Sequence, residues 1–189
     1  MALLPLRYLP DPILRKPAQK LTKVPPNFQR LVEDMVETMI AEHGVGLAAN
    51  QIGSLQKVAV IQLPEWEEPL VLINPEIVKR EGEQELEEGC LSIPGYRGLV
   101  KRSVRVRARA LGLDGKVIRI KAEGLLAQAL EHETDHLNGK LYIDHLVSRD
   151  KLWKLVPRAS GEEGHAHDGH GNSSVSPATP SADATPQES

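Results

Sequence analysis

The segment GLLAQALEHETDHL, residues 124–137, decides the fold, because it predicts a buried helix that can hold a metal ion. Its apolar residues recur at the spacing of one helix face: Leu125, Leu126, Ala129 and Leu130. Gly139 follows the predicted end of the helix. His132 and His136 are four residues apart, so they lie one turn apart on the same face. Both imidazoles can therefore bind one cation.

Glu133 follows the first histidine and lies about 100° further around the helix axis. It can lean over a metal ion without binding it, and take a proton from a water on the metal. The alternative is a surface helix with scattered histidines. The apolar run at residues 125–130 argues against that alternative, so the helix indicates a metal-dependent hydrolase.

A catalytic metal usually has three protein ligands, and the third ligand decides the class of enzyme. A histidine six residues after His136, as in metzincins, is excluded because Tyr142 occupies that position. A downstream glutamate, as in thermolysin-like peptidases, is disfavoured because the glutamates after His145 all lie in the C-terminal tail. The third ligand is therefore expected upstream, and the single cysteine, Cys90, is the obvious candidate. A buried structural thiol is the alternative interpretation of Cys90.

A third unusual stretch is GVGLAANQIG, residues 44–53. Its glycines allow the backbone to approach a ligand closely, and the side-chain amide of Gln51 can donate to an oxyanion. No Lys-Ser or Lys-Thr pair follows, so the stretch is only weakly similar to a phosphate-binding loop. A plain turn is the alternative.

Together these segments resemble the peptide deformylase family, whose signatures are a Leu-Ala-Ala-x-Gln loop, Glu-Gly-Cys-Leu-Ser and His-Glu-x-Asp-His. Residues 44–53, 88–92 and 132–136 match them in order, and residues 10–15 resemble the family's N-terminal stretch. The resemblance covers about residues 5–150. It implies an α+β fold with antiparallel sheets packed around a central metal-binding helix. It also implies a hydrolase that removes the N-formyl group from the initiator N-formylmethionine of nascent proteins and releases formate.

The resemblance further implies the metal ligands and the catalytic groups. One divalent metal, expected to be Fe²⁺ with Zn²⁺, Ni²⁺ or Co²⁺ as alternatives, would be held by Cys90, His132 and His136. Glu133 would act as general base and then as general acid. Gln51 and the backbone N–H of Leu91 would stabilise the oxyanion.

A substrate pocket is implied in the same way. Its expected members are Val45, Gly46, Gly89, Arg97 and Leu125. Val45, Gly46 and Leu125 would surround the substrate methionine, and the backbone of Gly46 and Gly89 would bind the peptide. Arg97 would lie near the entrance.

The remaining sequence predicts helices and mostly antiparallel strands. A helix is expected from Phe28 to about His43, with Leu31, Met35, Met39 and Ile40 on its core face. Strands are expected at residues 57–63, 70–73, 77–80, 103–110 and 116–122. Asp114 and Gly115 indicate a hairpin turn between the last two strands. A last short helix is expected at residues 149–156.

The chain of 189 residues suggests one catalytic domain, residues 1–159, followed by a tail. Residues 160–189 are rich in Ser, Pro and His, contain acids but no Lys or Arg, and are expected to be disordered. The net charge of −3 argues against direct DNA binding. Histidines in the tail could hold a metal loosely, although a bystander role is the commoner outcome.

One cysteine excludes a disulfide framework, and no signal peptide or membrane span is recognisable. The expected setting is therefore the cytoplasm, with a monomer acting on nascent N-formylmethionyl polypeptides. Basic residues within 149–158 suggest a weak contact with the ribosome near its exit tunnel, and Arg105, Arg107 and Arg109 could also touch RNA. The competing functions are a metallopeptidase that cuts internal peptide bonds and a non-enzymatic metal- or ribosome-binding module.

Overall fold

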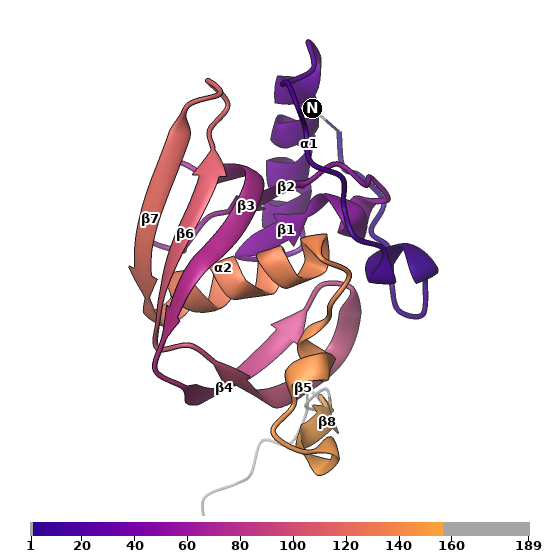
Figure 1. Ribbon diagram of the computed structural model, residues 1–189. Helices are drawn as coiled ribbons and strands as arrows, with labels where there is room; N and C mark the ends of the chain where they lie inside the picture. The colour runs from indigo at the N-terminus through magenta and orange to yellow at the C-terminus, as the bar shows by residue number, and fades with distance from the viewer. Residues whose placement is uncertain (1, 157–189) are drawn as a thin grey trace, which may run out of the picture. The chain divides into compact units, whose positions relative to one another are not determined.

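The structure is a computed structural model that describes residues 2–156, and these residues build two antiparallel sheets around one helix (Figure 1). The first sheet has the order β1 (Gly46–Ala48), β2 (Val58–Ile61), β3 (Leu70–Glu81), β6 (Arg105–Leu111) and β7 (Val117–Glu123). The second sheet has the order β4 (Gln84–Cys90), β5 (Ile93–Arg102) and β8 (Leu152–Lys154). The helices are α1 (Phe28–Ala41), α2 (Gly124–Leu137), and the short 3-10 turns η1 (Pro12–Arg15), η2 (Ala49–Ile52), η3 (Tyr142–His145) and η4 (Arg149–Lys151). The predicted α+β class is confirmed.

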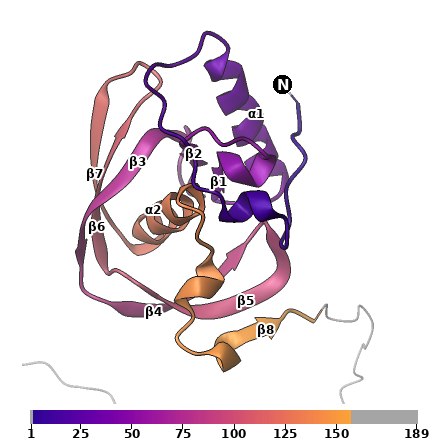
Figure 2. The same ribbon diagram turned by 45° about the vertical axis from the view of Figure 1, so that its right-hand side comes forward.

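Helix α2 lies between the two sheets, as expected for the central helix of the fold (Figures 1 and 2). Its buried side chains Ala127, Ala129 and Leu130 pack against Leu72 and Val106 of the five-stranded sheet. Small alanines on this face allow the helix to lie close to the strands. The histidine-bearing end of α2 is thereby fixed inside the molecule.

Helix α1 covers the neighbouring part of the same sheet, next to β1 and β2. Its core face consists of Phe28, Val32, Met35 and Met39, all almost fully buried. The prediction that Ile40 belongs to this face is wrong, because Ile40 is 54% exposed. Positions 28, 32, 35 and 39 form one helical stripe, and residue 40 lies about 100° beyond its last member. The helix ends at Ala41, slightly before the predicted end.

The hairpin of β6 and β7 follows the prediction closely. Val106, Ala108 and Ala110 are buried, whereas the arginines between them are exposed. The turn contains Gly115 with a φ of +74°, and the N–H of Gly112 donates to the carbonyl of Lys116. Asp114 and Gly115 therefore form the turn that their types favour.

Other strand predictions need correction. The segments 70–73 and 77–80 are one strand, β3, whose pairing with β6 shifts register between Ile73 and Glu76 and between Ile77 and Lys79. Pro75 lies in the first shift, where its missing N–H is tolerated. Strands β4 and β5 were not expected, because β4 is dominated by charged residues and β5 contains Pro94, Gly95 and Gly98.

The predicted helix at residues 149–156 is wrong. Only Arg149–Lys151 form a 3-10 turn, and Leu152–Lys154 form strand β8, which pairs with β5. The free edge of β5 supplies unpaired N–H and C=O groups, and these outweigh the weak helical preference of a short segment.

The predicted tail at residues 160–189 and the predicted domain boundary at residue 159 lie outside the described residues. Within residues 2–156, neither helix has the length and apolar character needed to cross a membrane.

Two glycines with the same backbone conformation allow the packing around α2 to be tested. Gly115 and Gly139 both have a φ of +74°, but a Cβ on Gly139 would lie 2.4 Å from the carbonyl oxygen of Arg15, whereas Gly115 faces open space. We expect Gly115→Ala to lower the free energy of unfolding by about 1–2 kcal/mol, the usual cost of this conformation. Gly139→Ala should cost a further ~1–3 kcal/mol, because the methyl group overlaps the main chain. Urea denaturation of both variants measures the difference, and equal losses would contradict the close packing at Gly139.

Candidate metal centre

The three predicted metal ligands lie together between β4 and α2. The Sγ atom of Cys90, at the end of β4, lies 3.1 Å from Nε2 of His136. Nε2 of His136 lies 3.1 Å from Nε2 of His132, one turn earlier on α2. The three ligand atoms all lie within 4.8 Å of one another. Two segments distant in the sequence therefore place one sulfur and two nitrogens around a single point.

The chemistry of these atoms fits a divalent cation. Burial lowers the pKa of His136 well below its ordinary value, so its imidazole stays neutral and able to coordinate. Burial also acts to lower the pKa of His132, but hydrogen bonds to Cys90 and Glu88 outweigh it and raise the pKa well above its ordinary value. The surroundings of His132 thus favour positive charge, which a bound cation would supply. One thiolate with two imidazoles suits Fe²⁺, Zn²⁺, Co²⁺ or Ni²⁺ better than Mg²⁺ or Ca²⁺.

The orientation of His132 is fixed by Glu88, a residue whose role the sequence analysis missed. Oε1 of Glu88 lies 2.5 Å from Nδ1 of His132, on the ring edge opposite the ligand atom. Such a carboxylate selects the tautomer that leaves Nε2 free to bind a metal. Burial acts to raise the pKa of Glu88, but hydrogen bonds from His132 and Arg102 hold it well below its ordinary value. Glu88 is therefore ionised when it holds the ring.

Arg102 of β5 in turn fixes Glu88. Its Nε and Nη2 donate to the two carboxylate oxygens of Glu88 at 3.0 and 2.7 Å, and its Nη1 donates to Asp135 at 2.6 Å. The side chains of Arg102 and Glu88 are only 3% and 4% exposed. His145 of η3 extends the network, with its Nε2 2.9 Å from Asp135. In the sequence, the one indication of this network is that Glu88 lies two residues before Cys90. No sequence pattern indicates a role for Arg102.

Gln51 approaches the metal centre from the side of η2. Its Oε1 accepts a hydrogen bond from the backbone N–H of Ala48 at 2.9 Å, which fixes the amide so that Nε2 points outward from η2. Nε2 lies 3.6 Å from Sγ of Cys90 and 3.1 Å from Oγ of Ser92. The adjacent Asn50 donates to the carbonyl of His136 at 2.5 Å and so ties η2 to α2. The amide donor predicted at residue 51 therefore faces the metal ligands.

Glu133 lies beside the ligands and is 4% exposed. Burial raises the pKa of Glu133 to about 7, and its Oε2 has no hydrogen-bond partner among the described residues. The opposite wall is the backbone of β1, where a Cβ on Gly46 would lie 2.2 Å from Oε1 of Glu133. Only glycine leaves room for this carboxylate at residue 46. A poorly solvated carboxylate of this kind is suited to accept and return a proton.

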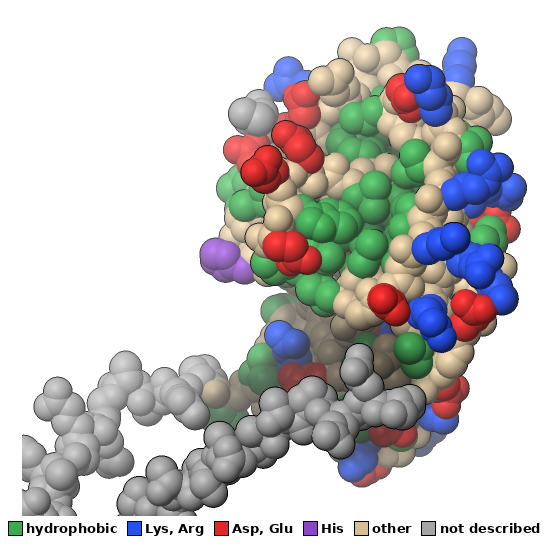
Figure 3. Space-filling model, turned by 90° about the vertical axis from the view of Figure 1, so that its left-hand side faces the viewer, with side chains coloured by type: hydrophobic (Ala, Val, Ile, Leu, Met, Phe, Trp, Pro, Cys, Tyr) green, Lys and Arg blue, Asp and Glu red, His purple; other side chains and the backbone are tan. Residues whose placement is uncertain are grey.

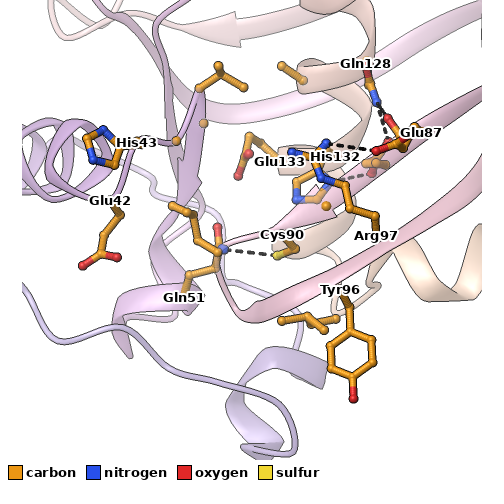
Figure 4. A pocket seen from close by; sticks show the side chains of 18 of the residues that line it. Glu42, His43, Gln51, Glu87, Cys90, Tyr96, Arg97, Gln128, His132 and Glu133 are labelled. Atoms are coloured by element: carbon orange, nitrogen blue, oxygen red, sulfur yellow. Dashed lines mark hydrogen bonds and ion pairs between the residues drawn. The ribbon is translucent and has the colours of Figure 1, made fainter. Parts of the chain in front are cut away.

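A cavity of about 490 Å³ opens onto these groups (Figure 4). The predicted residues that line it are Val45, Gly46, Gln51, Gly89, Cys90, Leu91, Arg97, Leu125, His132 and Glu133. His136 lies behind the cavity wall and is 1% exposed. Figure 4 shows Gln51 and Glu133 on the inner side near Cys90 and His132, with Arg97 close to Glu87. All but one of the predicted site residues thus surround one space.

Several lining residues were not predicted. They are Glu42, His43, Gly44, Glu87, Glu88, Ile93, Gly95, Tyr96, Gln128, Ala129 and Leu155. Gln128 donates to the carbonyl of Glu87 at 3.1 Å and to Glu88 at 3.2 Å, one turn of α2 before His132. Leu155 reaches the cavity because its N–H donates to the carbonyl of Gly95 and continues the pairing of β8 with β5. Without a predicted β8, the sequence offered no signal for Leu155.

Comparisons with known proteins agree with this geometry. The polypeptide deformylase family profile matches residues 3–152. A peptide deformylase of Dehalococcoides mccartyi (strain CBDB1) is 50% identical over 157 residues, which are 83% of this chain and 94% of that protein. The crystal structure of a peptide deformylase from Legionella pneumophila has a TM-score of 0.75 and 45% identity, covering 79% of this chain and 88% of that one. The structure of a Synechococcus elongatus peptide deformylase in complex with actinonin has a TM-score of 0.76 and 39% identity, over 78% of this chain and 83% of that one.

The contact between Glu88 and His132 predicts that the protein loses metal affinity when the negative charge of Glu88 is removed. We expect Glu88→Gln to weaken binding of Co²⁺ by about 10–100-fold, the usual effect of losing a carboxylate behind a ligating histidine. Titration of metal-free protein with Co²⁺, followed by the thiolate absorption band, measures the affinity.

Glu87→Gln is the matched control, because the side chain of Glu87 is 56% exposed and lies 3.8 Å from Arg97 rather than on a metal ligand. Equal Co²⁺ affinity in both variants would show that Glu88 does not hold His132 for the metal. Because Glu88 is also a partner of the buried Arg102, denaturation curves of both variants are needed to show whether each protein still folds.

Proposed function

Because the chain belongs to the peptide deformylase family, and so removes the formyl group from N-terminal formylmethionine, we propose which of its residues perform each part of that reaction. Glu133 is the proton carrier, Gln51 and Leu91 stabilise the oxyanion, and Cys90, His132 and His136 hold the metal. The observation that carries the proposal is that Glu133 and Gln51 line the same cavity as Cys90 and His132, whose ligand atoms lie within 4.8 Å of each other and of His136. A hydrolytic water and a formyl carbonyl would meet there.

One divalent metal, Fe²⁺, would be held by the thiolate and the two imidazoles, with Zn²⁺, Ni²⁺ or Co²⁺ as substitutes. Such a cation lowers the pKa of a water and polarises the carbonyl under attack. The mixed sulfur and nitrogen donors support a metal of this class rather than a hard cation.

Glu133 takes a proton from the attacking water and later delivers it to the leaving amine. Its burial supports both steps, because a carboxyl group with a pKa of about 7 can bind a proton and release it near neutral pH. Gly46 keeps the carboxylate beside the ligands, since any side chain at residue 46 would occupy the position of Oε1. Glu133 is therefore already positioned to move the proton from the water to the leaving amine.

Gln51 donates from Nε2 to the oxygen that becomes negative when the water attacks. The amide is preorganised, because Ala48 holds its Oε1 before any substrate arrives. Leu91 directly follows the ligand Cys90 and lines the same cavity, so its backbone N–H is the second proposed donor. Two donors from different segments would then face the same oxygen.

The substrate methionine would lie against Val45 and Leu125, with Gly46 nearby. Backbone groups of Gly46 and Gly89 would bond to the peptide, which glycine permits by leaving the main chain open. A Cβ at Gly89 would lie 3.4 Å from Nε of Arg97, which is an ordinary contact distance, so the side chain of Arg97 lies next to this backbone. Arg97 is 46% exposed in its side chain and stands at the entrance, where a longer peptide would leave the cavity.

The setting of the reaction is proposed from composition and surface charge. A catalytic unit of residues 1–159 would act as a cytoplasmic monomer. Nascent chains are the substrates, and a weak contact with the ribosome through the exposed residues Arg149, Lys151 and Lys154 would bring the enzyme to them.

The role of Glu133 is tested by Glu133→Gln, which keeps the shape of the side chain and removes its ability to accept a proton. We expect formate release from a formyl-Met peptide to fall by about 10²–10⁴-fold, while one metal ion per chain is retained. Formate is measured under nitrogen, and metal content by atomic absorption on the same samples.

Glu87→Gln serves again as control and should keep most of the wild-type rate. A Glu133→Gln protein that keeps its metal and its rate would remove Glu133 from the mechanism. Protein isolated under nitrogen should contain iron, and zinc as the predominant metal would count against the Fe²⁺ assignment.

The proposed ribosome contact predicts that the protein binds ribosomes more weakly when Arg149, Lys151 and Lys154 are all replaced by Gln, and that its binding then depends less on salt. Each lost phosphate contact should reduce the slope of log affinity against log salt by about one. Co-sedimentation with ribosomes at several salt concentrations measures this slope. The control variant carries Gln at Lys16, Lys20 and Lys23, which are equally exposed. Equal losses in both variants would point to nonspecific charge rather than this segment.

A further inference from the structure

A second hollow, outside the catalytic cavity, runs along α1 and shares no lining residue with that cavity. Its volume is about 710 Å³. One wall is α1, and the other is formed by the segment before β3 and the hairpin of β6 and β7, with Leu3 at one side. Figure 3 shows an apolar area at the middle of this face, with acidic side chains along one border. We call this feature the α1 groove.

The apolar side chains of the α1 groove are unusually exposed. Leu3 is 63%, Ile40 54% and Leu113 40% exposed, and they converge on one place in the fold. Val36 and Ile40 lie one turn apart on α1 and continue outward from Val32, a buried residue of the core face that also lines the groove. Scattered apolar residues on a surface need no explanation, but a contiguous stripe in a groove marks a site of interaction.

The border of the α1 groove on the side of the helix is acidic, whereas Figure 3 shows Lys and Arg side chains beyond the opposite side of the apolar area. Glu33 and Glu37 lie one turn apart beside the apolar stripe, and Glu68 lines the groove from the segment before β3. The lining contains no Lys or Arg. Oε2 of Glu37 is buried and has no hydrogen-bond partner among the described residues. A cationic group in the groove would offset the negative charge of these three carboxylates.

The chain itself does not supply a suitable occupant. Residues 160–189 contain five acids, no Lys or Arg, and Val175 as their one branched aliphatic residue, so charge and composition both oppose their binding there. A second copy docked through the same face would place Glu33 and Glu37 against their own equivalents. The occupant that fits is therefore a segment of a different protein.

We propose that the α1 groove binds an amphipathic helix of a partner protein, with aliphatic side chains on one face and Lys or Arg beside them. The aliphatic side chains would contact Val36, Ile40 and Leu113, and the basic ones would meet Glu33, Glu37 and Glu68. The lining stretch of α1, Gln29 to Ala41, is about 18 Å long at the helical rise per residue, which matches about three turns of a bound helix. This site is separate from the catalytic cavity and does not depend on the roles proposed for Glu133 or Gln51.

The test uses two synthetic helical peptides of the same length and leucine pattern. One carries Lys beside the leucines, and the other carries Glu at the same positions. Fluorescence anisotropy with the full-length, metal-loaded protein should show the Lys peptide binding at least about tenfold more tightly than the Glu peptide. Equal binding of the two peptides by the wild-type protein would overturn the proposal without any mutation.

Substitutions then locate the site. Ile40→Ser should weaken binding of the Lys peptide by about tenfold, as expected for losing an aliphatic contact in an interface. Val78→Ser is the matched control, because Val78 is 53% exposed on β3 and does not line the groove. An equal loss in the control, or no loss in Ile40→Ser, would overturn the proposal.

A charge exchange provides the sharpest outcome. The combined change Glu33→Lys and Glu37→Lys should make the protein prefer the Glu peptide. The matched control, Glu83→Lys with Glu85→Lys at the start of β4, should leave the preference unchanged. Formate release from a short peptide should stay at the wild-type level in every variant, which shows that each one is folded. A Glu33 and Glu37 variant that is active but still prefers the Lys peptide would contradict the proposed site.

Discussion

One buried arginine joins the two halves of the molecule. Arg102 of β5 binds Glu88 of β4 and Asp135 of α2, so the three-stranded sheet is tied to the central helix through charge rather than through apolar packing. Pairs this deeply buried contribute little net stability, but losing one partner leaves an unpaired charge and costs about 3–5 kcal/mol. Because Glu88 also holds His132, the contact that fixes the sheet is the same contact that sets the ligand geometry. Fold and metal site therefore depend on one set of hydrogen bonds.

The sequence predicted the parts of the site that are encoded locally. The spacing of His132 and His136 and the adjacent Glu133 need only a helix, and the turn at Asp114 and Gly115 needs only its own residue types. Cys90 was reached by excluding other ligands, and the structure brings it to the two histidines. The α+β fold and its family followed from three short motifs in order. The catalytic roles of Glu133, Gln51 and Leu91 and the substrate contacts stay predictions.

Other features depend on partners far away in the chain and left no local pattern. Strand β8 exists because β5 offers it an edge, and Glu88 matters because Arg102 reaches it from a strand fourteen residues later. Ile40 was assigned to the core because apolar residues at four helical positions do not reveal which stripe faces the sheet. Helix α1 in fact presents one stripe to the core and another to the α1 groove, and the residues that follow it, Glu42 and His43, line the catalytic cavity.

The close approach of Gly46 to Glu133 has a consequence for resistance to inhibitors. Many resistance mutations act by enlarging a side chain where an inhibitor touches the pocket wall. A larger side chain is not tolerated at residue 46, because its first added carbon would displace the carboxylate of Glu133, on which turnover is proposed to depend. An inhibitor that bonds to the main chain of Gly46 would contact atoms that substitution cannot remove. Resistance mutations would then be expected at residues further out, such as Arg97 or Leu125, where the exposed side chains can be replaced.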